Sequence, residues 1–432
     1  MHKVNLLLIV WYCLAGAHGR VWFIGDPMPG TNRTITEEPS SKPSWAGPLH
    51  VDMDRLEKII GHGVTKMALS MERVIGNEKE NFIFSPLSVA AALSVVLLGA
   101  VGQTGAELAY FLGLLAGVDF TDRTNVVHTQ LGRYFKKFEQ NSGVSQGTEL
   151  SFANGVFIQE GFSIEPKFDE TARNVYKCEV MPLDFLNNAQ EARRIVNEWV
   201  ANRTKGHIKE ILPDDLSPAT SVIIANAFYF NGQWEYPFYG KTRVGSFHVS
   251  KTESIDIPFM VNGAEIPYHY TNNYSIFGMP YKGKDLIMYI VLPQSNLHKF
   301  VSTLTVDSIE SMINQTKVQT LLFTVPRMKM KSMLNLRKPL EQLGIRSLFN
   351  PKTADLSGIA KGVYANNVYH KVEIQVTETG TVAAAGTAPG LVRGGVPFVR
   401  VDRPFLFFIY HNPTNTIMFW GSIYKPTPFF GS

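Results

Sequence analysis

Few residues of this sequence have the spacing that a catalytic or metal-binding centre requires. There is no Gly-x-Ser-x-Gly turn for a nucleophilic serine, no His-Glu-x-x-His zinc pair and no Cys-x-x-Cys pair. The 11 histidines are scattered without the spacing of metal ligands. The glycine-rich stretch 99–105 lacks the Lys-Ser/Thr of a phosphate-binding loop, so we interpret it as a turn. We expect no enzymatic activity, metal or cofactor; a hydrolase with an unrecognised site is the alternative.

One segment is unusual for another reason. Residues 378–387 begin with Glu378 and continue with almost only small side chains, among them Gly380, Thr381 and three consecutive alanines. Such a segment gains little by packing against a core. It could, however, enter between existing strands without a clash. A surface linker is the plain alternative.

Regular elements must position this segment. Apolar residues at helical spacing predict helices over 51–71, 85–99, 104–115, 125–140 and 189–211, and the last of these ends on Lys205-Gly206. Alternating or continuous apolar runs predict strands over 150–158, 221–230, 286–292, 321–325, 369–376 and 405–410. Helices followed by a long run of strands indicate an α+β fold built on a large mixed sheet.

Composition indicates a large globular protein. The sequence is 45% hydrophobic and 12% aromatic, and no Pro/Ser/Gly-rich linker interrupts residues 53–432, so we expect a single domain there. A net charge of +4 with 18% charged residues lacks the cationic density of a dedicated nucleic-acid binder.

The N-terminus predicts secretion. A short apolar run over 6–14 is followed by small residues, which is typical of a signal peptide over 1–19. A membrane anchor is the alternative, but the run is shorter than the ~20 residues that a spanning helix needs. Residues 20–52 have the proline-rich composition of a flexible arm. Cleavage would leave Cys178 as the one cysteine, either buried or as a reactive thiol.

Possible glycosylation sites agree with export. Four Asn-x-Ser/Thr sequons begin at Asn32, Asn202, Asn273 and Asn314. We expect two or three of them to be used. The secreted, extracellular protein should carry no membrane span.

The flanks of the small-residue segment identify a resemblance. Residues 369–374 precede it and residues 402–410 follow it, and both stretches resemble the serpin family. Further matches occur in the family's order, and the resemblance extends over about residues 53–427. These matches lie at 81–88, 150–154, 197–200, 204–208, 226–234 and 355–358.

The resemblance implies a serpin fold with a large mixed central sheet, further sheets and about nine helices. It also implies an exposed reactive-centre loop over about 378–403. A serine protease would cleave this loop and form a covalent acyl-enzyme, and the freed hinge would insert into the sheet and trap it. The hinge residues matched in this way are Glu378, Gly380, Thr381, Ala383, Ala384 and Ala385.

The resemblance also assigns residues around the point where the sheet must open. Glu378 is expected to pair with Arg327 on the opposite strand, and Trp234 matches the aromatic residue where insertion begins. The polar cluster below them is matched by Ser85, Ser88, Asn226 and His370.

The cleaved bond follows from the family's spacing. Counting back 11 residues from Pro404 gives Arg393, whereas counting forward 16 residues from Glu378 gives Gly394. Arginine fits the acidic specificity pocket of a trypsin-like protease, so we predict cleavage at Arg393-Gly394. Cleavage after Leu391 or Val392 would instead indicate an elastase-like target.

Two departures from the pattern bear on insertion. Pro389 cannot donate a ladder hydrogen bond, and Gly390, Gly394 and Gly395 make the loop flexible, so insertion could be partial or slow.

Other partners and functions remain open in the sequence. Arg133, Lys136 and Lys137 lie on one helical face that binds glycosaminoglycan in some relatives, although a solvated face is the alternative. The resemblance otherwise implies a monomer without nucleic-acid or membrane partners. A non-inhibitory carrier or storage protein is the rival function, against which the alanine-rich hinge argues.

Overall fold

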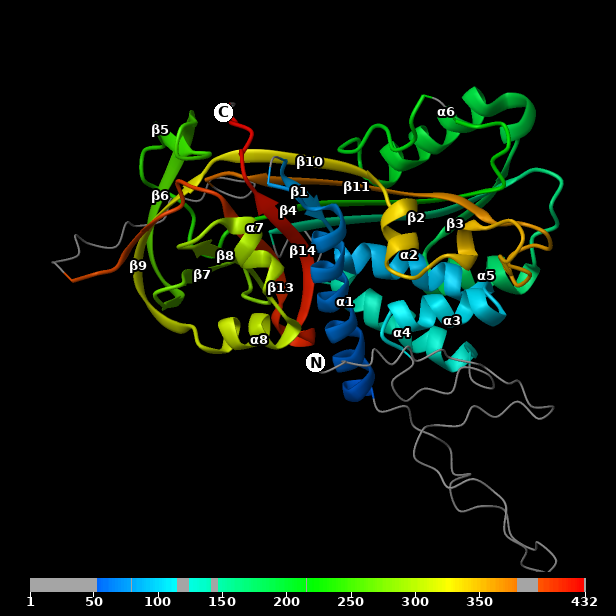
Figure 1. Ribbon diagram of the computed structural model, residues 1–432, viewed down its shortest axis with the longest axis horizontal. Helices are drawn as coiled ribbons and strands as arrows, with labels where there is room; N and C mark the ends of the chain where they lie inside the picture. The colour runs from blue at the N-terminus through cyan, green and yellow to red at the C-terminus, as the bar shows by residue number, and fades with distance from the viewer. Residues whose placement is uncertain are drawn as a thin grey trace, which may run out of the picture. The chain divides into compact units, whose positions relative to one another are not determined.

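The computed structural model describes residues 53–78, 80–114, 124–140, 147–214, 216–378 and 395–430. Residues 51–432 form one compact unit (Figure 1). None of the helices in the described ranges combines the length and apolar character that crossing a bilayer requires. The predicted signal peptide and N-terminal arm lie outside the described residues.

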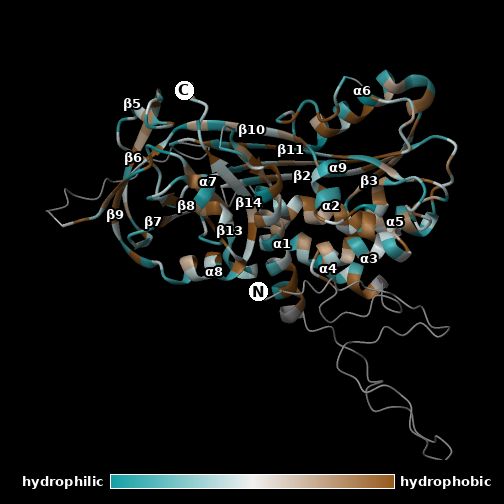
Figure 2. Ribbon diagram, viewed as in Figure 1, coloured by the Kyte–Doolittle hydropathy of each residue, from teal (hydrophilic) through white to brown (hydrophobic). Residues whose placement is uncertain are grey.

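Five helices form the N-terminal part of this unit. Within α2, only Leu98 is not buried, and Figure 2 shows its apolar character. This helix begins sharply because Pro86 occupies its first turn and Ser85 Oγ accepts a hydrogen bond from the Ser88 N–H. The five helices are α1 (Met53–Ile75), α2 (Pro86–Gly99), α3 (Gly102–Phe111), α4 (Thr124–Gln140) and α5 (Pro166–Tyr176).

A five-stranded sheet lies above these helices in Figure 1. Strand β4 is buried along its whole length, as its continuous apolar run predicts. The order is β10-β11-β4-β2-β3, and the pairs β11·β4 and β2·β3 are parallel while the others are antiparallel. The strands are β2 (Thr148–Gln159), β3 (Glu179–Leu183), β4 (Val222–Gly232), β10 (Met328–Asn335) and β11 (Ala365–Val376).

A second sheet occupies the other end of the molecule, where it packs beside the helices α7 (Leu297–Ser302) and α8 (Val306–Asn314). Within the described residues this sheet has nine strands, in the order β1-β14-β13-β8-β7-β6-β9-β12, with β5 paired to β6. The strands are β1 (Phe82–Phe84), β5 (Arg243–His248), β6 (Ser254–Tyr270), β7 (Tyr274–Pro280), β8 (Leu286–Pro293), β9 (Lys317–Pro326), β12 (Phe398–Arg400), β13 (Phe405–His411) and β14 (Thr416–Ile423).

Helix α6 (Phe185–Arg203) covers the other face of the five-stranded sheet. Its buried Val196 and Val200 pack in a separate apolar cluster with Phe157 of β2 and Tyr229 of β4. The helix predicted within 189–211 stops short of residue 211, next to the Lys205-Gly206 pair that the sequence indicates as its end. Lys205 and Gly206 adopt positive φ angles of 51° and 81°, which α-helical backbone does not allow, so the helix ends at Arg203.

The α+β fold class and the large mixed sheet are confirmed. The described residues contain nine α-helices, the last of them α9 (Arg337–Gln342). The predicted helix over 104–115 is displaced, since α3 begins at Gly102 and ends at Phe111.

Candidate functional site

The junction of β11 and β4, called the seam below, is the central feature of the five-stranded sheet. The two strands run parallel, with Val368 opposite Ile224 and Ile374 opposite Phe230. Each has an antiparallel neighbour on its other side. A strand that returned from the end of β11 into the seam would be antiparallel to both, and antiparallel pairing is slightly more stable per residue than parallel pairing.

The end of the seam at which β11 finishes, at Val376, is called its upper end, and the end at which β11 begins is called its lower end. The chain leaves β11 directly at the upper end. Here Thr377 O accepts a hydrogen bond from Trp234 Nε1 at 2.8 Å, and Glu378 O accepts one from the Phe238 N–H at 2.9 Å. The buried Trp234 ring stacks on Tyr281, with centroids 4.4 Å apart. The first two residues after β11 are therefore fixed by hydrogen bonds that their carbonyl oxygens accept from the segment that follows β4.

The carboxylate of Glu378 is also fixed. Its Oε2 lies 2.9 Å from Nε of Arg327, the ion pair expected from the sequence, and its Oε1 accepts a hydrogen bond from Thr242 Oγ1 at 2.5 Å. The Arg327 guanidinium lies over the Phe429 ring, 4.9 Å from its centroid. Only 13% of the Arg327 side chain and 25% of the Glu378 side chain are exposed, so solvent screens this pair weakly. The sequence did not indicate Thr242 or Phe429.

A buried polar cluster lies beneath the middle of the seam. Asn226 of β4 donates through Nδ2 to Ser88 O and to Asn154 Oδ1, and its Oδ1 accepts from Ser88 Oγ at 2.9 Å. His370 of β11 approaches the same Oδ1 with Nδ1 at 2.5 Å. Ser85, at the start of α2, donates its N–H to His370 Nε2 at 3.0 Å. The four residues assigned from the sequence thus lie in one network, together with Asn154.

The protonation of His370 is fixed by these contacts. Burial lowers its pKa from 6.5 to about 3, so the ring is neutral at physiological pH. Because Nε2 accepts from Ser85, the proton lies on Nδ1 and is donated to Asn226. The network therefore couples β11, β4 and α2 through neutral hydrogen bonds.

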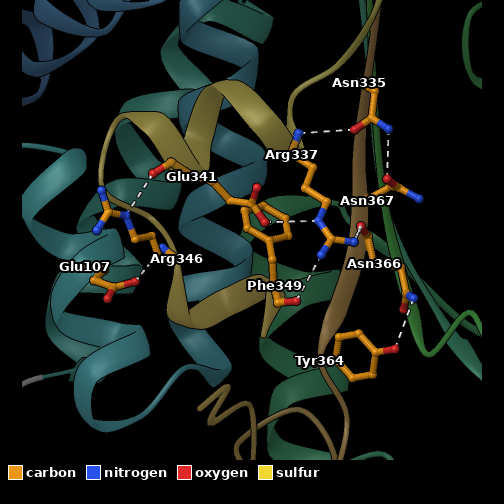
Figure 3. A network of polar contacts seen from close by, with 9 residues as sticks. All are labelled: Glu107, Asn335, Arg337, Glu341, Arg346, Phe349, Tyr364, Asn366 and Asn367. Carbon is orange, nitrogen blue, oxygen red and sulfur yellow. Dashed lines mark hydrogen bonds and ion pairs between the residues drawn. The ribbon is translucent and has the colours of Figure 1, made fainter. Parts of the chain in front are cut away.

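The lower end of the seam is held by a second network (Figure 3). Asn366, at the irregularity where β11 pairing with β4 begins, accepts through Oδ1 from the N–H groups of Ser221 at 2.6 Å and Val222 at 3.2 Å. Arg337 donates to Asn366 O at 3.1 Å and to Glu341 Oε1 at 3.1 Å. The sequence did not indicate this network, because isolated asparagines carry no signal of long-range pairing.

The remaining predicted loop and arm residues lie outside the described part of the chain. They are Asn32, Gly380, Thr381, Ala383, Ala384, Ala385, Arg393 and Gly394. Three predicted glycosylation sites are described, and Asn202, Asn273 and Asn314 are all exposed.

The basic face predicted on α4 is present in part. Arg133, Lys136 and Lys137 are exposed, but Lys137 forms an ion pair with Glu57 of α1.

Cys178 is 2% exposed, and burial raises the pKa of its thiol, which argues against the reactive-thiol alternative. Within the described ranges, no three His, Cys, Asp or Glu side chains are grouped as metal ligands would be.

Residues 62–426 match the family model described as Serpin (serine protease inhibitor). The chain is 30% identical over 382 residues to the leukocyte elastase inhibitor of Sus scrofa, which covers 84% of this chain and 98% of that protein. It is 30% identical over 368 residues to Iripin-8 of Ixodes ricinus, which covers 82% of this chain and 90% of that protein.

Two solved structures are similar to the fold. The native protease nexin-1 structure with heparin has a TM-score of 0.75 at 25% identity and covers 87% of this chain and all 100% of its own. The mouse protein-Z dependent protease inhibitor has a TM-score of 0.76 at 25% identity and covers 87% of this chain and 99% of its own. The family match, the relatives and the fold agree: this chain belongs to the serpin family.

Proposed function

We propose that this serpin inhibits a trypsin-like serine protease as a suicide substrate. The observation that carries the proposal is the parallel seam between β11 and β4, whose upper end is where the chain leaves β11 toward the small-residue hinge. A returning strand has only to turn once at Glu378 to lie between them. Relatives of this chain bear the names of protease inhibitors, which supports the same class of activity.

The chemistry begins at the Arg393-Gly394 bond. The protease serine hydroxyl attacks the Arg393 carbonyl carbon and gives up its proton to the protease's base. The peptide bond breaks, the Gly394 amine leaves with a proton, and Arg393 remains esterified to the serine. If the hinge inserts into the seam before water hydrolyses this ester, the protease is carried away with it and distorted.

Insertion can supply enough free energy for this work. Roughly 14 new ladder hydrogen bonds at ~0.5–1.5 kcal/mol each give on the order of 7–20 kcal/mol. A protease domain is stable by only about 5–15 kcal/mol, so the two quantities are comparable. The small side chains of Thr381, Ala383, Ala384 and Ala385 allow entry without steric cost.

Two features of the loop limit or define the reaction. Pro389 removes one ladder donor, so it should slow the last part of insertion and increase the share of protein that is simply cleaved. Arg393 selects a protease with an acidic specificity pocket, whereas Leu391 or Val392 at the cleaved bond would select an elastase-like enzyme. An inhibitor of this kind acts as a monomer.

We place the protein outside the cell, where it would regulate a proteolytic cascade. The signal-like residues 1–19 and the exposed sequons at Asn202, Asn273 and Asn314 support secretion and glycosylation. A weak glycosaminoglycan contact through Arg133 and Lys136 is compatible with their exposure, and the similar protease nexin-1 structure contains heparin. Since Lys137 is paired with Glu57, we expect it to contribute least.

The test is incubation with purified trypsin-like proteases, followed by denaturing electrophoresis and N-terminal sequencing. The proposal predicts a complex that survives SDS and a released peptide that begins at Gly394. An Arg393→Ala variant should lose the complex, and a protease with a blocked serine should form none. Complete cleavage without any stable complex would contradict inhibition and favour the carrier or storage alternative. A different new N-terminus would move the cleaved bond.

A further inference from the structure

An exposed aromatic side chain lies near the C-terminal end of the predicted reactive-centre loop. Phe398, on β12, is 58% exposed. Its strand is fixed, because Phe398 pairs with Leu322 of β9 and the Leu322 N–H donates to Pro397 O at 3.0 Å. A singly exposed apolar residue is common on any surface, so Phe398 becomes informative only through its surroundings.

Two arginines accompany Phe398. Arg400 projects from the same face of β12, because alternate residues of a strand share a face. Its guanidinium lies over the Phe259 ring at 5.2 Å from the centroid and is 3.3 Å from Asp402, yet 46% of the side chain is exposed. Arg243 pairs with Phe259 in the β5–β6 register and is exposed, and the described residues offer it no acidic partner. Phe398, Arg400 and Arg243 are called the docking face below.

The docking face follows the predicted Arg393-Gly394 cleavage site after only a few residues of the sequence. Phe398 follows Gly394 by four residues, so an extended chain places their Cα atoms at most about 14 Å apart. A protease domain of about 200 residues has a radius of gyration of roughly 16 Å. A protease bound at the predicted cleaved bond therefore has its own surface within reach of the docking face.

The chemistry of the docking face suits protein recognition. Aromatic and arginine side chains are enriched at the residues that dominate binding energy in protein interfaces. Arg400 is held in place by Phe259 and Asp402, so less side-chain freedom is lost on binding. Two guanidinium groups favour an acidic partner and increase its rate of association.

We propose that Phe398, Arg400 and Arg243 form a docking surface for the target protease, and that it selects a trypsin-like enzyme with an acidic and apolar rim beside its active site. This inference rests on the proposed inhibitory function. The docking face adds a second level of selection to that of Arg393. The specificity pocket of the protease recognises only the Arg393 side chain, whereas the docking face recognises the protease surface beside its active site.

The test uses the full-length protein and the protease that gives the highest yield of SDS-stable complex in a panel that includes trypsin. Phe398→Ala and the double variant Arg243→Ser/Arg400→Ser should each lower the second-order rate constant of inhibition by about tenfold. Their thermal midpoints and the number of inhibitor molecules used per protease should stay unchanged. The double variant should also lose most of the salt dependence of the rate.

Control variants are available on the same sheet. Val318→Ala removes a side chain that is 68% exposed at the other end of β9, and Lys251→Ser removes an exposed charge at the β5–β6 turn. Both should keep the unmodified rate. If all docking-face variants still form SDS-stable complexes at that rate, the docking surface is wrong while inhibition stands. If the unmodified protein forms no complex with any protease, inhibition fails and this inference fails with it.

Discussion

The carboxyl group of Glu72 is buried between α1 and β14, where only 3% of the residue is exposed. Trp420 Nε1 donates a hydrogen bond to Glu72 Oε2 at 2.7 Å. Burial raises the pKa of Glu72 from 4.5 to about 7, against the opposing effect of the hydrogen bond from Trp420. At neutral pH part of the folded protein therefore carries a buried negative charge on Glu72, whereas water would hydrate this carboxylate in the unfolded chain.

A Glu72→Gln variant should stabilise the protein at alkaline pH. Because the pKa is raised in the folded state, this group's stability contribution is full below about pH 4.5 and is lost as the pH rises through about 7. The penalty at pH 8 is on the order of 3 kcal/mol. Glutamine keeps an acceptor for Trp420 without the charge, so urea unfolding should show a gain of about 1–3 kcal/mol at pH 8 and little gain at pH 4.5. If the Glu72→Gln variant were instead less stable than the unmodified protein at pH 8, the charged Glu72 carboxylate would have to be stabilised by a partner in the folded state.

Single residues were the hardest feature to predict from the sequence. The resemblance indicated Ser85, Ser88, Asn226 and His370, and the structure places them in one network. Propensity and periodicity could not have grouped them, because the contacts of Asn226 join residues 72 to 144 positions apart and depend on strand register. Loop residues 379–394, including Arg393, are not among the described ones, so their roles stay predictions.

The proposed function depends on the seam, and Glu378 is fixed at its upper end. A Glu378→Lys substitution would place a second cation beside the largely buried Arg327, at a cost of about 3 kcal/mol. We expect the upper end of the seam to open and accept the loop of another molecule. Native gels after mild heating should then show polymers. Glu253→Lys is the control, because it breaks a surface ion pair with Lys425 whose partners are half exposed. A Glu378→Lys protein as monomeric as this control would count against the role of the ion pair.

Asn366 makes a corresponding prediction at the lower end. An Asn366→Ala substitution removes the acceptor for the Ser221 and Val222 N–H groups, which costs about 1–3 kcal/mol locally. Hydrogen exchange at these two amides should accelerate by roughly tenfold or more, while the thermal midpoint changes little. Asn335→Ala is a suitable control, since Asn335 bonds Asn367 at the exposed edge without touching β4. Equal exchange in both variants would mean that Asn366 does not hold the seam.

Several elements could be predicted because one strong local pattern dominates them. The continuous apolar run became β4, and the predicted strand over 405–410 became β13 with one more residue. The end of α6 could not be read from apolar spacing, since Ile208 and Ile211 continue the pattern beyond the helix and are buried in the same cluster as Val200. Apolar spacing records burial, and here the buried segment is only partly helical.

At the scale of the whole molecule, acid should destabilise the fold. Burial lowers the pKa of His370 from 6.5 to about 3 and that of His128 and His411 to about 4. A depressed histidine pKa contributes stability above pH 6.5 that is lost as the pH falls toward 3–4. Glu72 acts in the opposite sense, but it is one group against three. Between pH 7 and pH 5 we expect a net loss of about 3 kcal/mol, seen as a falling thermal midpoint. A flat or rising midpoint would mean that at least one of these histidines is charged in the fold.

Entry of the cleaved loop into the seam should raise the thermal midpoint of the protein. The chain should be cut at Arg393-Gly394 with a small amount of trypsin-like protease, purified from it and compared with the intact chain. Insertion worth on the order of 7–20 kcal/mol predicts a rise of about 10–25 °C. A Thr381→Arg variant cut at the same bond should show much less of this rise, because a long charged side chain resists entry. A cleaved protein that unfolds at or below the midpoint of the intact chain would mean that the loop does not enter the seam.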